Sequence, residues 1–250
     1  GGRAFQFHLF PLTSRELGDR FDLNHVLQFG SLPKVYEYKN SDDIKEFLRG
    51  YVSTYLKEEV VAEQWVRNLE PFRDFIEVAA QSNGKIINFS KIAREVGVDD
   101  KTIKTYQILE DTLVGFFLPP FHRSIRKRQR ESPKFFLFDT GVKRAIEKTL
   151  RLELTSQTYS YGDSFEHFLI SECFRMNEYL KLDFKISYLR TKDDLEIDLI
   201  IERPGEPDLL VEIKSASKVT EEHARQLNLI LKDWDRKAIA EVWSLDPLEK

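Results

Sequence analysis

The feature that most constrains the fold is the stretch EIDLIIERPGEPDLLVEIK at residues 196–214, in which two aliphatic-rich runs flank a Pro/Gly turn. Runs of this kind predict β-strands, and a turn over residues 203–207 predicts an antiparallel hairpin centred on Gly205. Any fold of this chain is therefore expected to contain a β-sheet in which these two strands are neighbours.

The register of this hairpin brings charged residues together. With the pairing centred on Gly205, Asp198 faces Glu212 and Glu196 faces Lys214. Side chains alternate across a strand, so Glu212 and Lys214 share one face. Two facing carboxylates repel each other unless a cation lies between them, and Mg²⁺ binds through carboxylate oxygens. An ordinary solvated strand face with a cross-strand ion pair is the alternative that charge alternation alone allows.

Length and composition favour a globular protein of two or three domains. The chain has 250 residues, of which 41% are hydrophobic and 12% aromatic, enough to build apolar cores. Its single cysteine, Cys173, excludes an internal disulfide framework, and no apolar run approaches the roughly 20 residues that span a bilayer. We therefore expect a cytoplasmic protein that has no membrane contact. A net charge of −4 argues against extensive coating of nucleic acid, so any such contact is expected to be local.

The chain divides into three predicted segments. Residues 1–66 begin with FQFHLFPL, a predicted strand and loop, and continue into an amphipathic helix capped by Ser41 or Asp42. Residues 67–140 contain a helix followed by a winged helix-turn-helix. Residues 141–250 follow the order helix, three strands, helix, strand, which predicts helices packed over a short central mixed sheet. The predicted fold class is therefore mixed α/β.

A helix-turn-helix is predicted within residues 87–114. Gly84 ends the preceding helix, and Ala93, Gly97 and Ile103 supply the small residue, turn glycine and core aliphatic residue of the motif. Two strands, VGFFLPPF and KFFLFD, then flank a long loop, as in the wing of a winged helix. The exposed positions of the recognition helix offer few residues suited to reading bases, which favours contact with the nucleic-acid backbone.

The wing loop between His122 and Lys134 is strongly basic. Its many cations against a single acid are typical of a phosphate-binding surface, which predicts contact with nucleic acid, preferentially DNA. An ordinary solvated loop is the alternative interpretation. The predicted nucleic-acid-binding residues are Arg123, Arg126, Lys127, Arg128, Arg130 and Lys134.

The third segment carries an acid on its first helix, then an Asp, and then Glu-x-Lys on the next strand, and this pattern resembles the core of the PD-(D/E)XK nuclease superfamily. Glu166, Asp198 and Glu212-x-Lys214 match this pattern in type and order, and Gln226 resembles a glutamine that some branches add. The resemblance implies phosphodiester hydrolysis with Mg²⁺ or Mn²⁺ bound by Asp198 and Glu212. It also implies that Lys214 assists the attacking water and that Glu166 binds the metal directly or through a water. All five residues are thus candidates for a catalytic site.

A wider resemblance covers nearly the whole chain. GGRAFQFHLFPLTSREL is similar to the end of a bacterial and archaeal AAA-type ATPase module, and the segments from GSLPKVYEY to the acidic hairpin are similar to the domain of unknown function that follows it. This resemblance implies that residues 1–66 are the end of the module and a helical linker or lid. ATP would bind only to an N-terminal domain, because these residues contain no G-x-x-x-x-G-K-[ST] loop. Association as a homo-oligomer is compatible with this interpretation.

One leading interpretation and two alternatives follow. The leading one is the C-terminal region of an AAA-type ATPase, in which a winged-helix-like domain at residues 67–140 binds DNA and a nuclease-like domain at residues 141–250 hydrolyses phosphodiesters. The first alternative is a non-catalytic module in which the same fold serves DNA docking or assembly of the ATPase. The second alternative is a winged-helix transcription regulator with a preferred DNA sequence.

Overall fold

Helices and two β-sheets form the described part of this computed structural model, which comprises residues 7–55, 76–88, 94, 114–122, 132–193 and 195–247. The helices are α1 (Ser14–Leu17), α2 (Leu23–Phe29), α3 (Ser41–Gly50), α9 (Thr140–Ile146), α10 (Tyr159–Leu180) and α11 (Arg225–Lys232), and residues 76–81 are also helical. There are also the 3₁₀-helices η1 (Gly18–Arg20) and η2 (Pro33–Glu37) and the π-helix η3 (Tyr51–Tyr55). The strands are β1 (Gly115–Leu118), β2 (Lys134–Leu137), β3 (Lys185–Arg190), β4 (Glu196–Glu202), β5 (Asp208–Lys214) and β6 (Ala238–Ser244). The architecture is mixed α/β, as predicted.

The four-stranded sheet contains the predicted hairpin. Its strand order is β3-β4-β5-β6, in which β3, β4 and β5 are antiparallel to one another and β6 is parallel to β5. Leu199 pairs with Val211 and Ile201 with Leu209, which is the register expected for a hairpin centred on Gly205. The parallel pair β5–β6 needs a crossover connection, and α11 lies within it. The succession of helix, three strands, helix and strand is therefore confirmed.

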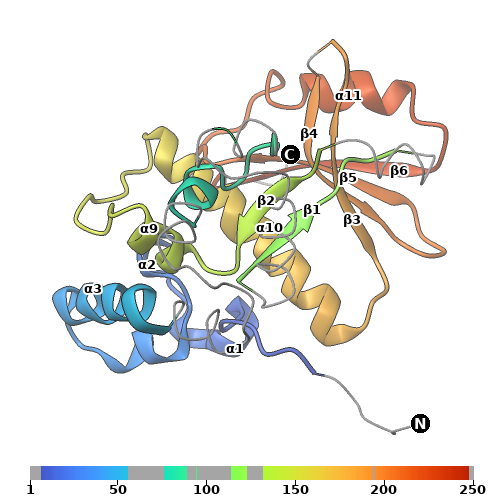
Figure 1. Ribbon diagram of the computed structural model, residues 1–250. Coiled ribbons are helices and arrows are strands. Elements are labelled where there is room, and N and C mark those ends of the chain that lie inside the picture. The colour runs from blue at the N-terminus through green and yellow to red at the C-terminus, as the bar shows by residue number, and fades with distance from the viewer. Residues whose placement is uncertain are drawn as a thin grey trace, which may run out of the picture.

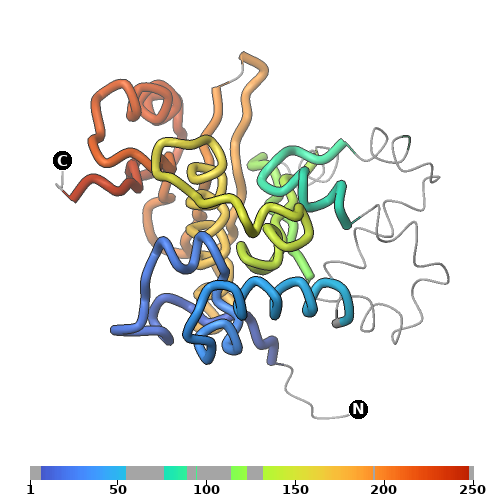
Figure 2. Tube along the Cα trace, turned by 90° about the vertical axis from the view of Figure 1, so that its left-hand side faces the viewer, coloured from blue at the N-terminus to red at the C-terminus, as the bar shows by residue number. Residues whose placement is uncertain are grey.

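Helices pack against both faces of this sheet (Figure 1). Leu209, Val211 and Ile213 of β5 share an apolar cluster with residues of α10, as alternation along the strand predicts. Leu210 packs on the other face with Leu227 of α11. Figure 2 shows α11 in red on one side of the orange strands β3 and β4, with the green segment 76–88 on the other side.

An irregularity in β4 lies beside Asp198. Ser187 of β3 pairs with Ile200, whereas Leu189 pairs with Ile197, so two steps along β3 correspond to three steps along β4. Ile197 and Ile200 both pack against the α11 side, although residues three apart on a regular strand lie on opposite faces. The extra residue is a β-bulge, and a bulge redirects the side chains next to it.

The two strands that flank the basic loop pair with each other as predicted. β1 and β2 are antiparallel, with Gly115 opposite Leu137 and Leu118 opposite Lys134. This hairpin packs on α10, where the rings of Phe116 and Phe174 stack with 4.3 Å between their centroids. This two-stranded sheet is therefore attached to the helix that carries Glu166.

Much of the predicted winged helix lies outside the described residues. The helix-turn-helix residues Ala93, Gly97 and Ile103 belong to that part, as do residues 123–131 of the basic loop. Gly84 has a φ of 73° and follows the helical residues 76–81, which confirms the predicted helix end. The helix-turn-helix itself stays a prediction.

The strand predicted in FQFHLFPL is wrong for the described residues 7–12, which are irregular. Their backbone is held by α10 instead of by a sheet, since the Phe10 amide donates a hydrogen bond to Tyr179 Oη at 2.9 Å. Alternation of apolar and polar residues predicts a strand only where another strand is available for pairing.

The predicted N-cap of α3 lies one or two residues too far along the chain. Asn40 is the N-cap, and its side-chain oxygen accepts a hydrogen bond from the Asp43 amide at 2.8 Å. The predicted caps Ser41 and Asp42 are the first two residues of the helix itself. Asn, Ser and Asp can all cap a helix, so the local sequence offered three adjacent candidates.

A buried polar network joins the N-terminal helices to α10 and α9. Asp139, the N-cap of α9, accepts hydrogen bonds from the Ser31 amide at 2.7 Å and the Val142 amide at 2.9 Å. Arg175 of α10 donates to Ser31 Oγ at 3.1 Å and contacts Glu172 Oε1 at 3.3 Å. These buried charges are compensated by one another and by backbone groups.

The apolar core also extends across the predicted segments. One cluster contains Leu17 and Leu27 from the first segment, Phe116 from the second, and Phe165 and Val211 from the third. All three segments therefore pack together, and the domain boundaries near residues 66 and 140 stay predictions.

Candidate carboxylate–lysine site

The predicted nuclease-like residues converge on one pocket of about 430 Å³. Its walls come from α10, β2, β3, β4, β5 and α11, with a further contribution from residues 83–86. The pocket is lined by all five predicted catalytic residues, Glu166, Asp198, Glu212, Lys214 and Gln226. The structure thus brings together residues that are far apart in the sequence.

Asp198 and Glu212 lie on neighbouring strands of this pocket. Asp198 Oδ2 accepts a hydrogen bond from the Ile213 amide at 2.7 Å, which ties it to the strand that carries Glu212. Glu212 Oε1 contacts Lys214 Nζ at 2.6 Å, whereas Glu212 Oε2 is buried and has no hydrogen-bond partner among the described residues. A buried acceptor without a partner costs about 1 to 3 kcal/mol, so this oxygen is suited to a donor or a cation.

Three carboxylates of the pocket, Glu212, Glu166 and Asp198, have raised pKa values and so hold their protons more tightly than isolated carboxylates do. Burial, and then the charge of Asp198, raises the pKa of Glu212 to about 6. Burial also raises the pKa of Glu166 to about 7, although Lys134 opposes this effect. The pKa of Asp198 is raised by burial too, against the effect of the Ile213 amide. All three carboxylates therefore lie where additional positive charge would be stabilising.

Lys134, predicted from the sequence as a nucleic-acid-binding residue of the basic loop, lines this pocket instead. It is only 4% exposed, and its Nζ lies 2.7 Å from Glu196 Oε1 and 3.3 Å from Glu166 Oε1. Burial alone would lower the pKa of this lysine, but the two carboxylates outweigh burial and raise it above the usual value. Glu196 therefore pairs with Lys134, whereas Lys214 pairs with Glu212 on its own strand.

Lys134 and Glu196 are the pocket residues whose role the sequence analysis missed. Lys134 opens the strand KFFLFD, and all four residues of β2 are buried. The signal available in the sequence was a single charged residue, Lys134, at the start of an otherwise apolar strand. Gln226 is present in the pocket as predicted, but its Oε1 accepts a hydrogen bond from the Glu196 amide at 3.2 Å, so it supports the start of β4.

The donor groups fit a hard divalent cation bound by Asp198 and Glu212. Carboxylate oxygens are the ligands that Mg²⁺ prefers, and Glu212 Oε2 has no competing hydrogen bond within the described structure. In the described ranges, no group of three or more His, Cys, Asp or Glu side chains could hold a metal ion as it stands. Two protein carboxylates are nevertheless sufficient for Mg²⁺, because this ion usually keeps several waters.

Replacing Glu212 by glutamine is expected to stabilise the fold at pH 8 by about 2 kcal/mol in the absence of divalent cations. The pKa of Glu212 rises from 4.5 to about 6 on folding, so its contribution to stability is complete below pH 4.5 and is lost as the pH rises through about 6. Glutamine stays neutral and avoids this loss. Urea denaturation at pH 4.5 and pH 8 measures the effect, and a variant that is less stable than the wild type at pH 8 would contradict it.

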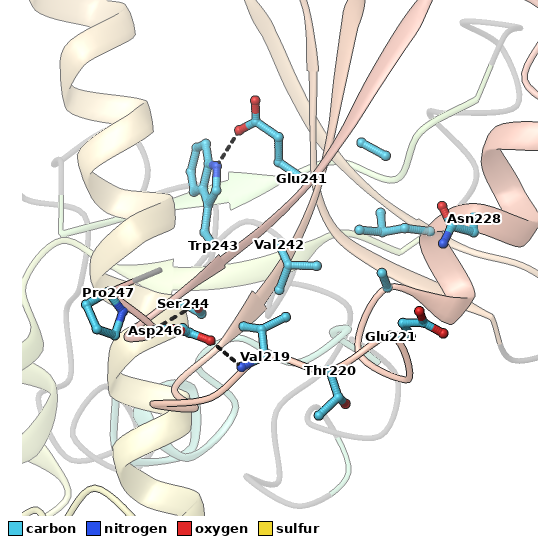
Figure 3. Close-up of a pocket in the computed structure, with 13 residues that line it drawn as sticks. Val219, Thr220, Glu221, Asn228, Glu241, Val242, Trp243, Ser244, Asp246 and Pro247 are labelled. Carbon is cyan, nitrogen blue, oxygen red and sulfur yellow. Dashed lines mark hydrogen bonds between the residues drawn. The ribbon is translucent and has the colours of Figure 1, made fainter. Parts of the chain in front are cut away.

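A second, larger pocket of about 940 Å³ lies between α11 and β6 (Figure 3). The Val219 amide of the preceding loop donates a hydrogen bond to Asp246 Oδ2 at 2.7 Å, and Trp243 Nε1 donates to Glu241 Oε2 at 2.8 Å. None of the predicted catalytic residues lines this pocket. Its size therefore does not make it the better candidate for the predicted chemistry.

Fold and pocket together define a mixed α/β protein with a buried carboxylate–lysine pocket beside a four-stranded sheet. The chain belongs to the family described as Domain of unknown function (DUF8612), which matches residues 20–157. A second family, described as Domain of unknown function (DUF4143), matches residues 161–244, which include α10 and the four-stranded sheet. DUF4143 is a domain found in C-terminal regions associated with AAA ATPases, which agrees with the wider resemblance noted in the sequence.

Two mycobacterial proteins are similar to this chain, namely "Uncharacterized protein Mb2031c" of Mycobacterium bovis and "Uncharacterized protein Rv2008c" of Mycobacterium tuberculosis. Each is 30% identical over 215 residues, which cover 82% of this chain and 46% of the relative. The chain thus spans less than half the length of these relatives. No solved structure matches the chain. Within the described residues, no helix is long and apolar enough to cross a bilayer.

Proposed function

We propose that this chain is the C-terminal part of an AAA-type ATPase and that its pocket hydrolyses phosphodiesters in DNA with a divalent cation, Mg²⁺ or Mn²⁺. The observation that carries the proposal is the Asp198–Glu212 pair, in which one buried carboxylate oxygen has no hydrogen bond and Lys214 lies beside the other. The order of α10, β3, β4, β5, α11 and β6 supports it, because this is the order of the nuclease core that the sequence resembles.

Each residue of the pocket would have a separate role. Asp198 and Glu212 would hold the cation, whose positive charge would polarise the scissile phosphate and lower the pKa of the attacking water. Lys214 is partly exposed, with 40% of its side chain accessible, so its ammonium group could reach the phosphate while staying near Glu212. Gln226 would keep the start of β4 in place through the Glu196 amide.

The basic loop between His122 and Lys134 would guide DNA to this pocket. Lys134 ends the loop and lines the pocket, so phosphates bound by the neighbouring cations would lie close to the carboxylates. The proposed phosphate contacts are Arg123, Arg126, Lys127, Arg128 and Arg130, whereas Lys134 is committed to Glu166 and Glu196.

Cleavage of linear, circular and branched DNA with Mg²⁺ or Mn²⁺ tests the proposal. Asp198→Asn and Lys214→Met are each expected to lower the cleavage rate by about 100-fold or more, because the bound cation and the Lys214 ammonium group would stabilise the charge that develops on the phosphate in the transition state. DNA binding, measured separately, is expected to persist. Glu206→Gln is the matched control, since Glu206 is an exposed carboxylate of the hairpin turn.

A non-catalytic docking module is the second candidate, and the paired lysines favour it. Lys134 and Lys214 already compensate part of the carboxylate charge, so the pocket is also compatible with a purely structural network. This candidate predicts that reversing the charges of Arg126, Lys127 and Arg128 abolishes DNA binding, while Asp198→Asn changes no activity. Binding without metal-dependent cutting by the wild type would establish it and retire the nuclease proposal.

A further inference from the structure

Lys134 places a positive charge in the pocket from outside the unit formed by α10 to β6. It lies on β2, within the residues matched by DUF8612, whereas its partners Glu166 and Glu196 lie within the residues matched by DUF4143. Its Nζ lies within 3.3 Å of an oxygen of each carboxylate. The pocket is therefore built jointly by the two family segments.

The backbone around Lys134 is held on two sides. The Ile87 amide donates a hydrogen bond to the Pro133 carbonyl at 2.9 Å, and Tyr188 Oη of β3 donates to the Ser132 carbonyl at 2.6 Å. The Lys134 ammonium also lies 5.4 Å from the centroid of the Tyr188 ring, a favourable cation–π distance. With its backbone anchored and its side chain 5% exposed, this charge has a fixed position.

A divalent metal ion would also need two carboxylates that face one common position. Lys134 Nζ occupies this position between Glu166 and Glu196. Lys214 lies beside Glu212 Oε1, so Asp198 and Glu212 Oε2, which is unpartnered among the described residues, are left for a divalent ion. A second ion would have to displace the Lys134 ammonium from its two carboxylates.

We propose that Lys134 acts as a built-in second cation, which limits this pocket to a single divalent ion at Asp198 and Glu212. The inference rests on the proposed function, because it assumes that this pair binds a metal. Glu166 then belongs to Lys134 and is not a metal ligand.

Counting bound Mn²⁺ by EPR during a titration of the whole chain at pH 8 tests this inference. The wild type is expected to bind one ion, and Asp198→Asn none. Lys134→Met is expected to bind two ions, because the second enters between Glu166 and Glu196. Lys134→Met/Asp198→Asn is expected to bind one, at the new position. Lys85→Met is the matched control and is expected to bind one, since Lys85 lines the same pocket but donates to the Gln81 carbonyl.

The possible results separate this inference from the proposed function. Two ions in the wild type, or a single ion in a folded Lys134→Met variant, would overturn the inference and leave the metal site intact. Absence of Mn²⁺ binding in the wild type would overturn both. If Lys134→Met does not fold without metal, Mn²⁺ is expected to restore its circular dichroism spectrum, because the ion replaces the lost charge. Failure of Mn²⁺ to restore the spectrum would count against the inference. The number of Mn²⁺ ions bound by the wild type tests the inference whether or not the variant folds.

Discussion

Replacing Lys134 by methionine is expected to lower the free energy of unfolding by about 3 to 5 kcal/mol at pH 8 without divalent cations. Methionine keeps much of the length and apolar contact of the stem but leaves Glu166 and Glu196 without their shared cation. Removing the buried lysine is costly because its two carboxylates, with 24% and 33% of their side chains exposed, stay largely out of water and lose their compensating charge. Urea denaturation followed by circular dichroism measures the loss.

The loss of unfolding free energy caused by Lys134→Met is expected to be smaller at pH 5 than at pH 8. The pKa of Lys134 is raised above 10.5 in the folded state, so its stabilising charge is present at both pH values and is lost only at higher pH. The pKa of Glu166 is about 7, so this group is mostly protonated at pH 5 and needs the lysine less. The pH dependence of the difference between variant and wild type therefore comes from the carboxylates.

Two further variants control this prediction. Lys85→Met removes an exposed lysine of the same pocket and is expected to change stability by less than about 0.5 kcal/mol. Lys134→Met/Glu166→Gln removes one of the orphaned carboxylates and is expected to recover part of the loss. Equal stability of Lys134→Met and Lys85→Met would show that the buried contacts contribute little.

Replacing Asp139 by alanine is expected to destabilise the fold by about 3 to 5 kcal/mol, because three contributions are lost at one buried position. Its carboxylate caps α9 at the Val142 amide and accepts the hydrogen bond of the Ser31 amide. It also lies near Arg175, whose guanidinium would lose a compensating charge in the interior. Thermal and urea unfolding at pH 7 measure the change.

Asp22→Ala provides the matched control for this second prediction. Asp22 caps α2 through a hydrogen bond from the His25 amide at 3.0 Å, but it is exposed to solvent. Its loss is expected to cost only about 1 kcal/mol, the usual contribution of an N-cap. If both substitutions have the same effect, capping alone accounts for Asp139, and its burial near Arg175 adds nothing.

The local sequence determined the elements that depend on neighbouring residues. The alternation of aliphatic residues around Gly205 predicted the pairing of Leu199 with Val211, because the turn sets the register of a hairpin. The helix predicted at the start of residues 141–250 is α10, in which Phe165 and Phe168 recur at helical spacing on one apolar face. Residues of the pocket that lie on these elements, such as Glu166 and Glu212, could therefore be predicted before the structure was known.

Only the tertiary structure decided which charges meet. The bulge beside Asp198 depends on how β3 pairs with β4, and the place of Lys134 depends on how β2 packs against α10 and β3. Lys134 and Glu166 are 32 positions apart in the chain, so no local pattern links them. The sequence determined that Lys134 is a cation at the start of a strand. Packing of that strand determined that the cation is buried between two carboxylates, because burial is a property of the assembled elements and not of the residue.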